Sequence, residues 1–141
     1  MIIRFVGSPP TSQYLSVARV REAVPELAQA TDARIIGLIK QASKIVDGFI
    51  GRRLGRARLI EAIDVGGDQM LLHYLPIVQL HAAGREGEPV EIETLEVLSF
   101  DYGVVLDLNN FGPATGVQGL WRWVRAARWA IEYTGGYALP G

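Results

Sequence analysis

Arginine side chains offer this sequence its most distinct chemistry, and many of them stand in two short groups. The first group follows a predicted helix and consists of Arg52, Arg53, Arg56 and Arg58. Guanidinium groups bind phosphates and carboxylates through paired hydrogen bonds. A purely structural interpretation stays open, because cations at the end of a helix also compensate its dipole. Four arginines exceed what that compensation requires, so contact with a partner or with DNA is the second interpretation.

The second group interleaves arginines with tryptophans between positions 121 and 129. It consists of Trp121, Arg122, Trp123, Arg125, Arg128 and Trp129. Such surfaces bind single-stranded nucleic acid because bases stack on aromatic rings. Tryptophan and arginine also anchor protein interfaces, and we favour this interpretation. The candidate residues for an interface between subunits or with a partner are therefore Arg52, Arg53, Arg56, Arg58, Trp121, Trp123, Arg125 and Arg128.

Catalytic chemistry finds little support in the sequence. The two histidines, His73 and His81, stand in no metal-ligand or triad spacing, so a hydrolase that uses either as its base is unsupported. The acidic residues between positions 86 and 96 lack the glycine and the spacing of a calcium loop. We therefore expect no enzyme activity, no catalytic or metal-binding residues and no cofactor.

The composition points to one soluble domain with apolar surface left over. The chain has 141 residues, 49% of them hydrophobic, and 14 basic against 15 acidic side chains give a net charge of -1. This balance provides no overall attraction to nucleic acid or to an anionic membrane. Cysteine is absent, which excludes disulfides and thiolate metal sites. No stretch resembles a signal peptide or a membrane span, so we expect a cytoplasmic protein.

Helical periodicity dominates the first part of the chain. Ser16 is placed to cap a first helix that Pro25 ends or kinks. Thr31 or Asp32 then caps a long helix that could run to Leu54. Its apolar residues recur at steps of three and four, and they are Ile35, Leu38, Ile39, Ala42, Ile45, Val46, Phe49 and Ile50. We expect this helix to be the spine of the core, with Gly55 at its stop position.

Alternating patterns follow after Arg56 and predict a small antiparallel sheet. Leu59, Glu61, Ile63 and Val65 alternate with the residues between them, and Gly66-Gly67-Asp68 predicts a hairpin turn into residues 69–73. Further strands are predicted around 77–83, 97–100 and 104–108, the last two as a pair. Residues 120–133 fit a helix or a strand, and their aromatic content favours the strand. The predicted class is thus α+β: a short helix and a long amphipathic helix packed on antiparallel strands, with a strand at the end.

These predictions divide a single domain into four parts. Residues 1–14 form an N-terminal arm, and the apolar residues from Ile2 to Val6 suit either such an arm or an edge strand. Residues 15–55 form the helical part, and residues 56–108 with 120–137 form the β part. Residues 109–119 contain three glycines and a proline without any period, which predicts a flexible loop.

The order of several short motifs resembles the head-tail connector proteins of tailed phages, the adaptor or head-completion family. These motifs are Phe49-Ile50-Gly51-Arg52-Arg53-Leu54 after a long helix, a strand with Asp64, the step Leu75-Pro76-Ile77-Val78, and a closing Tyr133-Thr134-Gly135-Gly136-Tyr137. The resemblance spans about residues 15 to 140. It implies a structural protein of the virion neck, made in the host cytoplasm. Such a protein forms a ring, commonly of twelve subunits, between the portal and a stopper or tail, and double-stranded DNA passes through it.

Family adaptors carry a further C-terminal helix that docks on the portal, whereas this chain ends at Leu139-Pro140-Gly141. We therefore expect the last five residues, the arm of residues 1–10 or the loop of residues 109–119 to supply part of that contact. The candidate docking residues are Phe111, Tyr137, Leu139 and Pro140. The expected partners are other copies of the chain, the portal, the stopper or tail-completion protein, and passing DNA, with no membrane. A small nucleic-acid-binding module that uses the arginine groups is the alternative.

Overall fold

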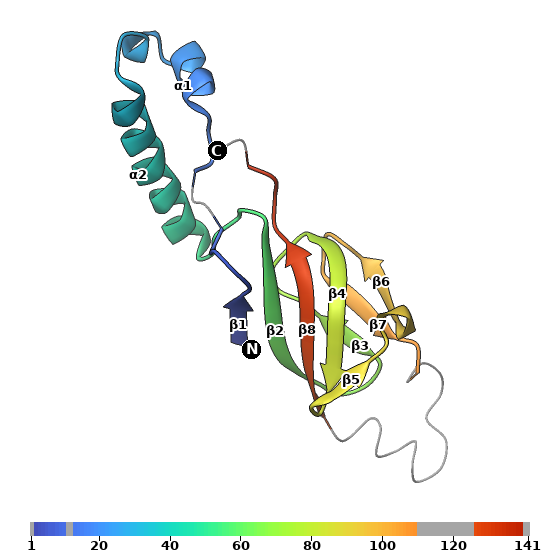
Figure 1. Cartoon of the computed structure of the whole chain (residues 1–141). Coiled ribbons are helices and arrows are strands. Elements are labelled where there is room, and N and C mark those ends of the chain that lie inside the picture. The colour runs from blue at the N-terminus through green and yellow to red at the C-terminus, as the bar shows by residue number, and fades with distance from the viewer. Residues whose placement is uncertain (1, 11–12, 110–125, 140–141) are drawn as a thin grey trace. The chain divides into compact units, whose positions relative to one another are not determined.

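The computed structural model describes residues 2–10, 13–109 and 126–139 of the chain (Figure 1). It contains helices and antiparallel sheets, so the predicted α+β class is confirmed. The chain forms two compact units, which we describe separately. The strands lie in a β unit within Met1–Ser8 and Ala57–Gly136, and the helices lie in a helical unit within Pro9–Arg56 and Tyr137–Gly141.

The β unit consists of two antiparallel sheets. The larger has the strand order β1-β2-β8-β4-β5, and Figure 1 shows β2, β8 and β4 side by side. The smaller has the order β3-β7-β6. The strands are β1 Ile2–Phe5, β2 Ala57–Val65, β3 Gln69–Leu71, β4 Ile77–Arg85, β5 Glu88–Val90, β6 Leu95–Ser99, β7 Val104–Asp107 and β8 Ala127–Gly135. A short 3-10 helix, Ile92–Thr94, precedes β6.

Alternation along β2 and β8 builds the core of this unit, because every second side chain points to the same face. The register pairs Leu59 with Tyr133, and Ile63 with Trp129. All four side chains are buried. The edge strand predicted at the N-terminus is confirmed as β1, which pairs with β2. The strand preference predicted near the end of the chain is confirmed for residues 127–135.

The turn at Gly66-Gly67 has a different role from the predicted one. It does not close a hairpin, because β2 belongs to the larger sheet and β3 pairs with β7 in the smaller sheet. Gly67 has a φ of 109°, which supports a tight change of direction. Alternation identifies a strand but does not identify its neighbour. The pattern therefore could not predict that the chain passes from the larger sheet to the smaller one at this turn. The predicted pairing of the two later strands is confirmed as β6 and β7.

Two glycines allow the segment between β3 and β4 to pack closely against both sheets. A side chain at Gly103 would place its Cβ 2.3 Å from the carbonyl oxygen of Leu72, and one at Gly135 would place it 2.1 Å from that of Tyr74. Gly136 has a φ of 89° and donates a hydrogen bond to Pro76. In the closing double glycine, Gly135 therefore lets the backbone of Tyr74 come close, and Gly136 provides the left-handed turn.

The helical unit contains α1 (Val17–Ala23), a 3-10 helix (Pro25–Leu27) and α2 (Asp32–Ile50). Ser16 is the N-cap of α1, as predicted, and Thr31, one of the two predicted candidates, is the N-cap of α2. The helix α2 ends before Leu54, because Gly51 adopts a left-handed φ of 80° at its C-cap. Our choice of Gly55 for this stop was wrong, although the physical reason was right.

Two tyrosines hold the segment that follows α2. The backbone N–H of Tyr14 donates to Ser43 Oγ at 3.1 Å, and its hydroxyl donates to the Asp47 carboxylate. The same hydroxyl accepts the N–H of Leu54 at 3.2 Å. On the other side, Tyr137 donates its N–H to Leu54 and accepts that of Arg56. The chain before α1 and the chain after β8 are thus both bonded to residues 54–56.

The expectation that α2 forms the spine of the core was wrong. The hydrophobic core of the β unit consists of residues between 57 and 133, most of them in strands, and contains none of the helix residues. Within α2 only Ile35, Ile39 and Ser43 are buried. Amphipathic periodicity identified the apolar face of the helix but not what covers it.

Candidate interaction surfaces

An exposed apolar stripe runs along α2. It consists of Leu38, Ala42, Ile45 and Phe49, at steps of four, three and four residues. Ile45 is 73% exposed and Phe49 is 92% exposed. Steps of three and four are the spacing with which one helix packs along another. The periodicity of these residues predicted an apolar stripe, but the prediction that the stripe lies in the core was wrong for Ile45 and Phe49.

The first half of the stripe borders an apolar groove, because α1 lies beside only that half of α2 (Figure 1). The groove has a volume of about 320 Å³. It is lined by Leu15, Arg19, Val20, Ala23, Val24, Leu38, Ile39 and Ala42. Arg19 is the one charged residue of that lining, and it pairs with Glu22 at 3.3 Å. The groove thus combines an apolar floor with a charged rim.

Two glycines of α2 lie next to its polar face, and one of them, Gly48, is about one turn from Ile45 of the stripe. Gly37 and Gly48 lie about three turns apart, so they share a side of the helix. A Cβ added at either position would meet no heavy atom within 4 Å. Glycine inside a helix is less favourable than alanine by about 0.5–1 kcal/mol. Packing within the described part of the unit does not require either glycine, so both leave room for close approach from outside.

The first arginine group divides between the two units. Arg52 and Arg53 border an open depression of about 460 Å³ with Lys44, Asp47 and neighbouring glycines. Arg53 Nη1 donates to the carbonyl of Pro10 at 3.4 Å. Arg56 belongs to the same helical unit. Arg58 lies on β2 instead, where its Nε is 2.7 Å from Glu132 Oε1 on β8. Three of the four arginines therefore belong to the helical unit. The fourth, Arg58, belongs to the β unit and forms an ion pair there.

The second group is only partly described. Trp121, Trp123 and Arg125 lie outside the described residues. Arg128 is on β8, with its Nε 3.4 Å from Asp64 Oδ1 of β2. Trp129, which interleaved with these arginines in the sequence, is buried in the core.

The docking candidates are also partly described. Phe111 and Pro140 lie outside the described part, as does the predicted loop beyond Asn109. Tyr137 is 52% exposed, so its ring is accessible although its backbone is bonded on both sides. Leu139 is half-buried.

A polar network lies inside the β unit, around the fully buried carboxylate of Glu61. Tyr133 donates its hydroxyl proton to Glu61 Oε2 at 2.6 Å, and the backbone N–H of His73 donates to the same oxygen at 3.0 Å. The ring Nδ1 of His73 contacts Oε1. Tyr133 accepts the N–H of Tyr74 at 3.0 Å. Burial, followed by the hydrogen bond to Glu61 and its negative charge, raises the pKa of the Tyr133 hydroxyl well above its ordinary value.

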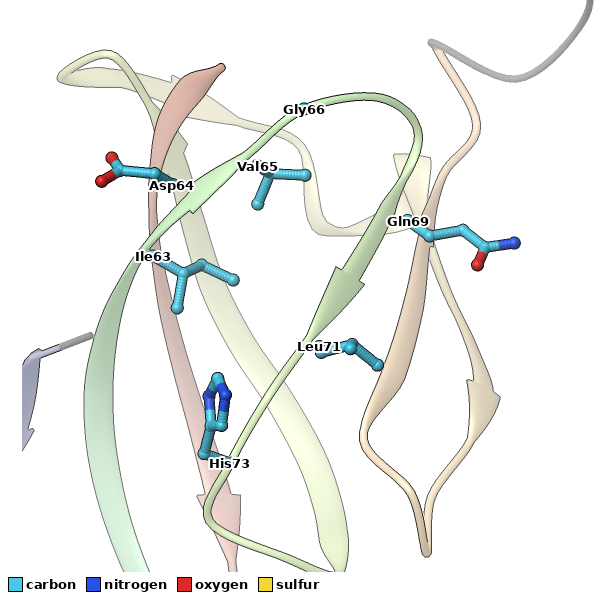
Figure 2. A pocket seen from close by; sticks show the side chains of 7 residues that line it. All are labelled: Ile63, Asp64, Val65, Gly66, Gln69, Leu71 and His73. Carbon is cyan, nitrogen blue, oxygen red and sulfur yellow. The ribbon is translucent and has the colours of Figure 1, made fainter. Parts of the chain in front are cut away.

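His73 borders a slot of about 410 Å³ between β2 and β3. Figure 2 shows the side chains of Ile63 and His73 turned toward one another across this slot, while Asp64 points away on the other side of β2. A histidine oriented by a buried glutamate can act as a base. The slot's other lining residues, all in the described part of the chain, are Val65, Gly66, Gln69 and Leu71, so no serine, threonine or cysteine is among them. The geometry thus links the crossing between the sheets to the buried carboxylate of Glu61.

The remaining polar residues fit structural roles. His81 Nε2 is 2.7 Å from Thr134 Oγ1, a contact between β4 and β8.

Across residues 2–10, 13–109 and 126–139, no three histidine, aspartate or glutamate side chains gather closely enough to hold a metal ion. In the same described ranges, none of the helices has the length and apolar character that crossing a membrane requires.

Comparison with known proteins identifies a similar fold. No protein-family model matches the chain, and no curated protein matches it. A chain from the solved structure "Neck of empty GTA particle computed with C6 symmetry", where GTA stands for gene transfer agent, is similar with a TM-score of 0.61. The two chains are 18% identical, and the match covers 98% of this chain and 72% of the other. The shared architecture therefore extends over both units.

Proposed function

We propose that this chain is a structural adaptor in the neck of a phage-like particle. Copies of it form a closed ring, commonly of twelve subunits, between the portal and the stopper or tail-completion protein, and double-stranded DNA passes through without sequence-specific contact. The observation that carries the proposal is the fold shared with a chain of a particle neck over 98% of this chain. Fold alone permits many functions, so the surfaces of the chain must also suit assembly.

The exposed stripe on α2 supports an assembling protein. Monomeric soluble proteins rarely expose contiguous apolar surface, and such surface commonly marks an interaction site. Ile45 and Phe49 expose most of their side chains on one face of one helix. A subunit that is covered by its neighbours would bury this surface upon assembly.

The proposed contacts with other neck proteins use the accessible residues at the end of the chain. Tyr137 and Leu139, with Phe111 and Pro140, are proposed to meet the portal or the tail side. Arg52, Arg53 and Arg56, with Trp121, Trp123 and Arg125, are proposed for contacts between subunits or with partners. Arg58 and Arg128 already have carboxylate partners within the β unit, so their share in such contacts is proposed to be smaller.

The alternative nucleic-acid-binding module is less well supported. Such a module needs a continuous basic surface, and the net charge of the chain is -1. Arg58 and Arg128, on the sheet, both have carboxylate partners. A salt titration separates the two functions, because affinity for DNA falls steeply with added salt when phosphate contacts dominate.

Imaging the particle that contains this chain tests the proposal. Cryo-electron microscopy of the purified particle is expected to show a ring of this fold below the portal. A neck without such a ring, in a particle that carries the chain elsewhere, would exclude the adaptor function. Tight and salt-sensitive binding of the isolated chain to double-stranded DNA would instead favour the alternative.

A further inference from the structure

We propose that neighbouring copies bind each other through α2: the second half of the stripe on one copy, Ile45 and Phe49, docks into the α1–α2 groove of the next copy. This inference rests on the proposed ring and names its contact surface. The occupant of the groove is thus a second copy of this chain.

The groove and the ridge complement each other in chemistry. The groove is lined mainly by aliphatic side chains and has a volume of about 320 Å³. Ile45 and Phe49 form an apolar ridge 73% and 92% exposed, which the described part of their own chain does not cover. Aromatic and aliphatic anchors that fill apolar pockets carry most of the binding energy at protein interfaces.

The groove and the ridge lie at different positions along the same helix. The groove borders α2 at Leu38 and Ala42, whereas the ridge follows at Ile45 and Phe49. The two centres are about seven residues, or about 10 Å, apart along the helix axis. A surface that is displaced from its complement on the same chain can bind copy to copy in one direction, and such contacts close into rings. The solved neck with a similar chain has six-fold symmetry in its description, which suits a ring and not an isolated pair.

A second copy can approach α2 closely beside Ile45. Gly48 lies about one turn from Ile45 and has open space above its Cα atom. A small residue beside an apolar seam lets two helix backbones come near each other. Contact between copies thereby explains Gly48, which weakens the isolated helix.

Cross-linking tests this contact, because the natural chain has no cysteine. The double variant Val24→Cys with Val46→Cys places one thiol in the groove and one about one turn from Phe49, and it keeps both ridge residues. A short bis-maleimide is added to this variant, alone and together with the portal protein. Both positions are at least 38% exposed, so the changes are expected to leave the fold intact. The matched control is Lys40→Cys with Val46→Cys, because Lys40 is exposed on the face of α2 opposite the groove.

We expect a ladder of covalent dimers, trimers and larger species that ends at the closed ring, and at least a tenfold weaker ladder in the control. Products that stop at the dimer would overturn the proposal, because they indicate a two-fold contact. Absence of cross-links while the same variant still forms rings with the portal would overturn the contact and leave the ring intact. Absence of rings in the unmodified chain would contradict the proposed function itself.

Discussion

The hydroxyl of Tyr133 donates a hydrogen bond to Glu61 Oε2 at 2.6 Å, and both side chains are completely buried. This contact joins β8 to β2 across the core face of the larger sheet. The hydroxyl also accepts the N–H of Tyr74 at 3.0 Å, which ties the segment between the sheets to the same point. The strands β2 and β8 and the segment between the sheets are therefore joined at a buried, hydrogen-bonded carboxylate.

Removing that hydroxyl is expected to destabilise the β unit. The variant Tyr133→Phe leaves Glu61 with one donor fewer and removes the hydroxyl oxygen that accepts the N–H of Tyr74. Burying unsatisfied polar groups costs about 1–3 kcal/mol each, so the free energy of unfolding is expected to fall by about that amount. Urea unfolding monitored by tryptophan fluorescence measures the change. The matched control is Tyr102→Phe, at a tyrosine that is 77% exposed. Equal stability of both variants would contradict the role of the network.

Alkaline pH is expected to weaken the same contact. Burial first, and then Glu61, raise the pKa of Tyr133 above its value in the unfolded chain. A group with a raised folded-state pKa contributes stability that is fully present below the unfolded pKa, here about 10, and is lost as the pH rises above it. The loss is expected to reach about 1.4 kcal/mol per pH unit. The free energy of unfolding of the natural chain and of Tyr133→Phe is measured from about pH 8 to about pH 11.5. The difference between the two free energies is expected to shrink above about pH 10. A constant gap would contradict the assignment.

Gly135 is expected to tolerate no side chain. Its Cβ would lie 2.1 Å from the backbone oxygen of Tyr74, which cannot move aside without displacing the segment between the sheets. Gly135→Ala is therefore expected to lower the free energy of unfolding by about 1–3 kcal/mol, the range for overpacked cores. Thermal unfolding of this variant checks the prediction. A melting temperature equal to that of the natural chain would show that residues 72–74 do not pack as described.

Gly48 is expected to give the opposite result for stability. Because a Cβ at this position meets no atom within 4 Å, Gly48→Ala should stabilise α2 by about 0.5–1 kcal/mol. The same methyl group narrows the space beside Ile45 and Phe49, so assembly should weaken if copies approach there. Circular dichroism measures the first effect and sedimentation measures the second. A variant that is more stable and assembles as well as the natural chain would exclude close approach at Gly48.

Local sequence patterns predicted most of the secondary structure, because their causes are local. Ser16 and Thr31 cap helices through their own side chains, and alternation placed Trp129 and Tyr133 on the same face as Ile131. Alternation also placed Glu61 in phase with Leu59 and Ile63, which was the available signal for a buried carboxylate. Its partners come from residues 12 and 72 positions away, and no local pattern reports them.

Two features could not be predicted for a different physical reason. The periodicity of α2 fixes which side chains share a face, but burial depends on what the rest of the chain places there. The helix α1 has only seven residues and reaches along only the first half of α2. Ile45 and Phe49 were therefore assigned to a core that does not cover them. The arginine group from 52 to 58 spans the boundary between the units. The spacing of these arginines in the sequence likewise could not predict that they belong to two different units.

The central claim is that this chain is a ring-forming component of a particle neck. Native mass spectrometry of the chain mixed with the portal protein of its particle tests it most directly. The proposal predicts a single closed complex in which the portal binds a fixed multiple of this chain, with Phe49→Ser reducing the multiple. A chain that remains monomeric and unbound at every portal concentration would contradict it.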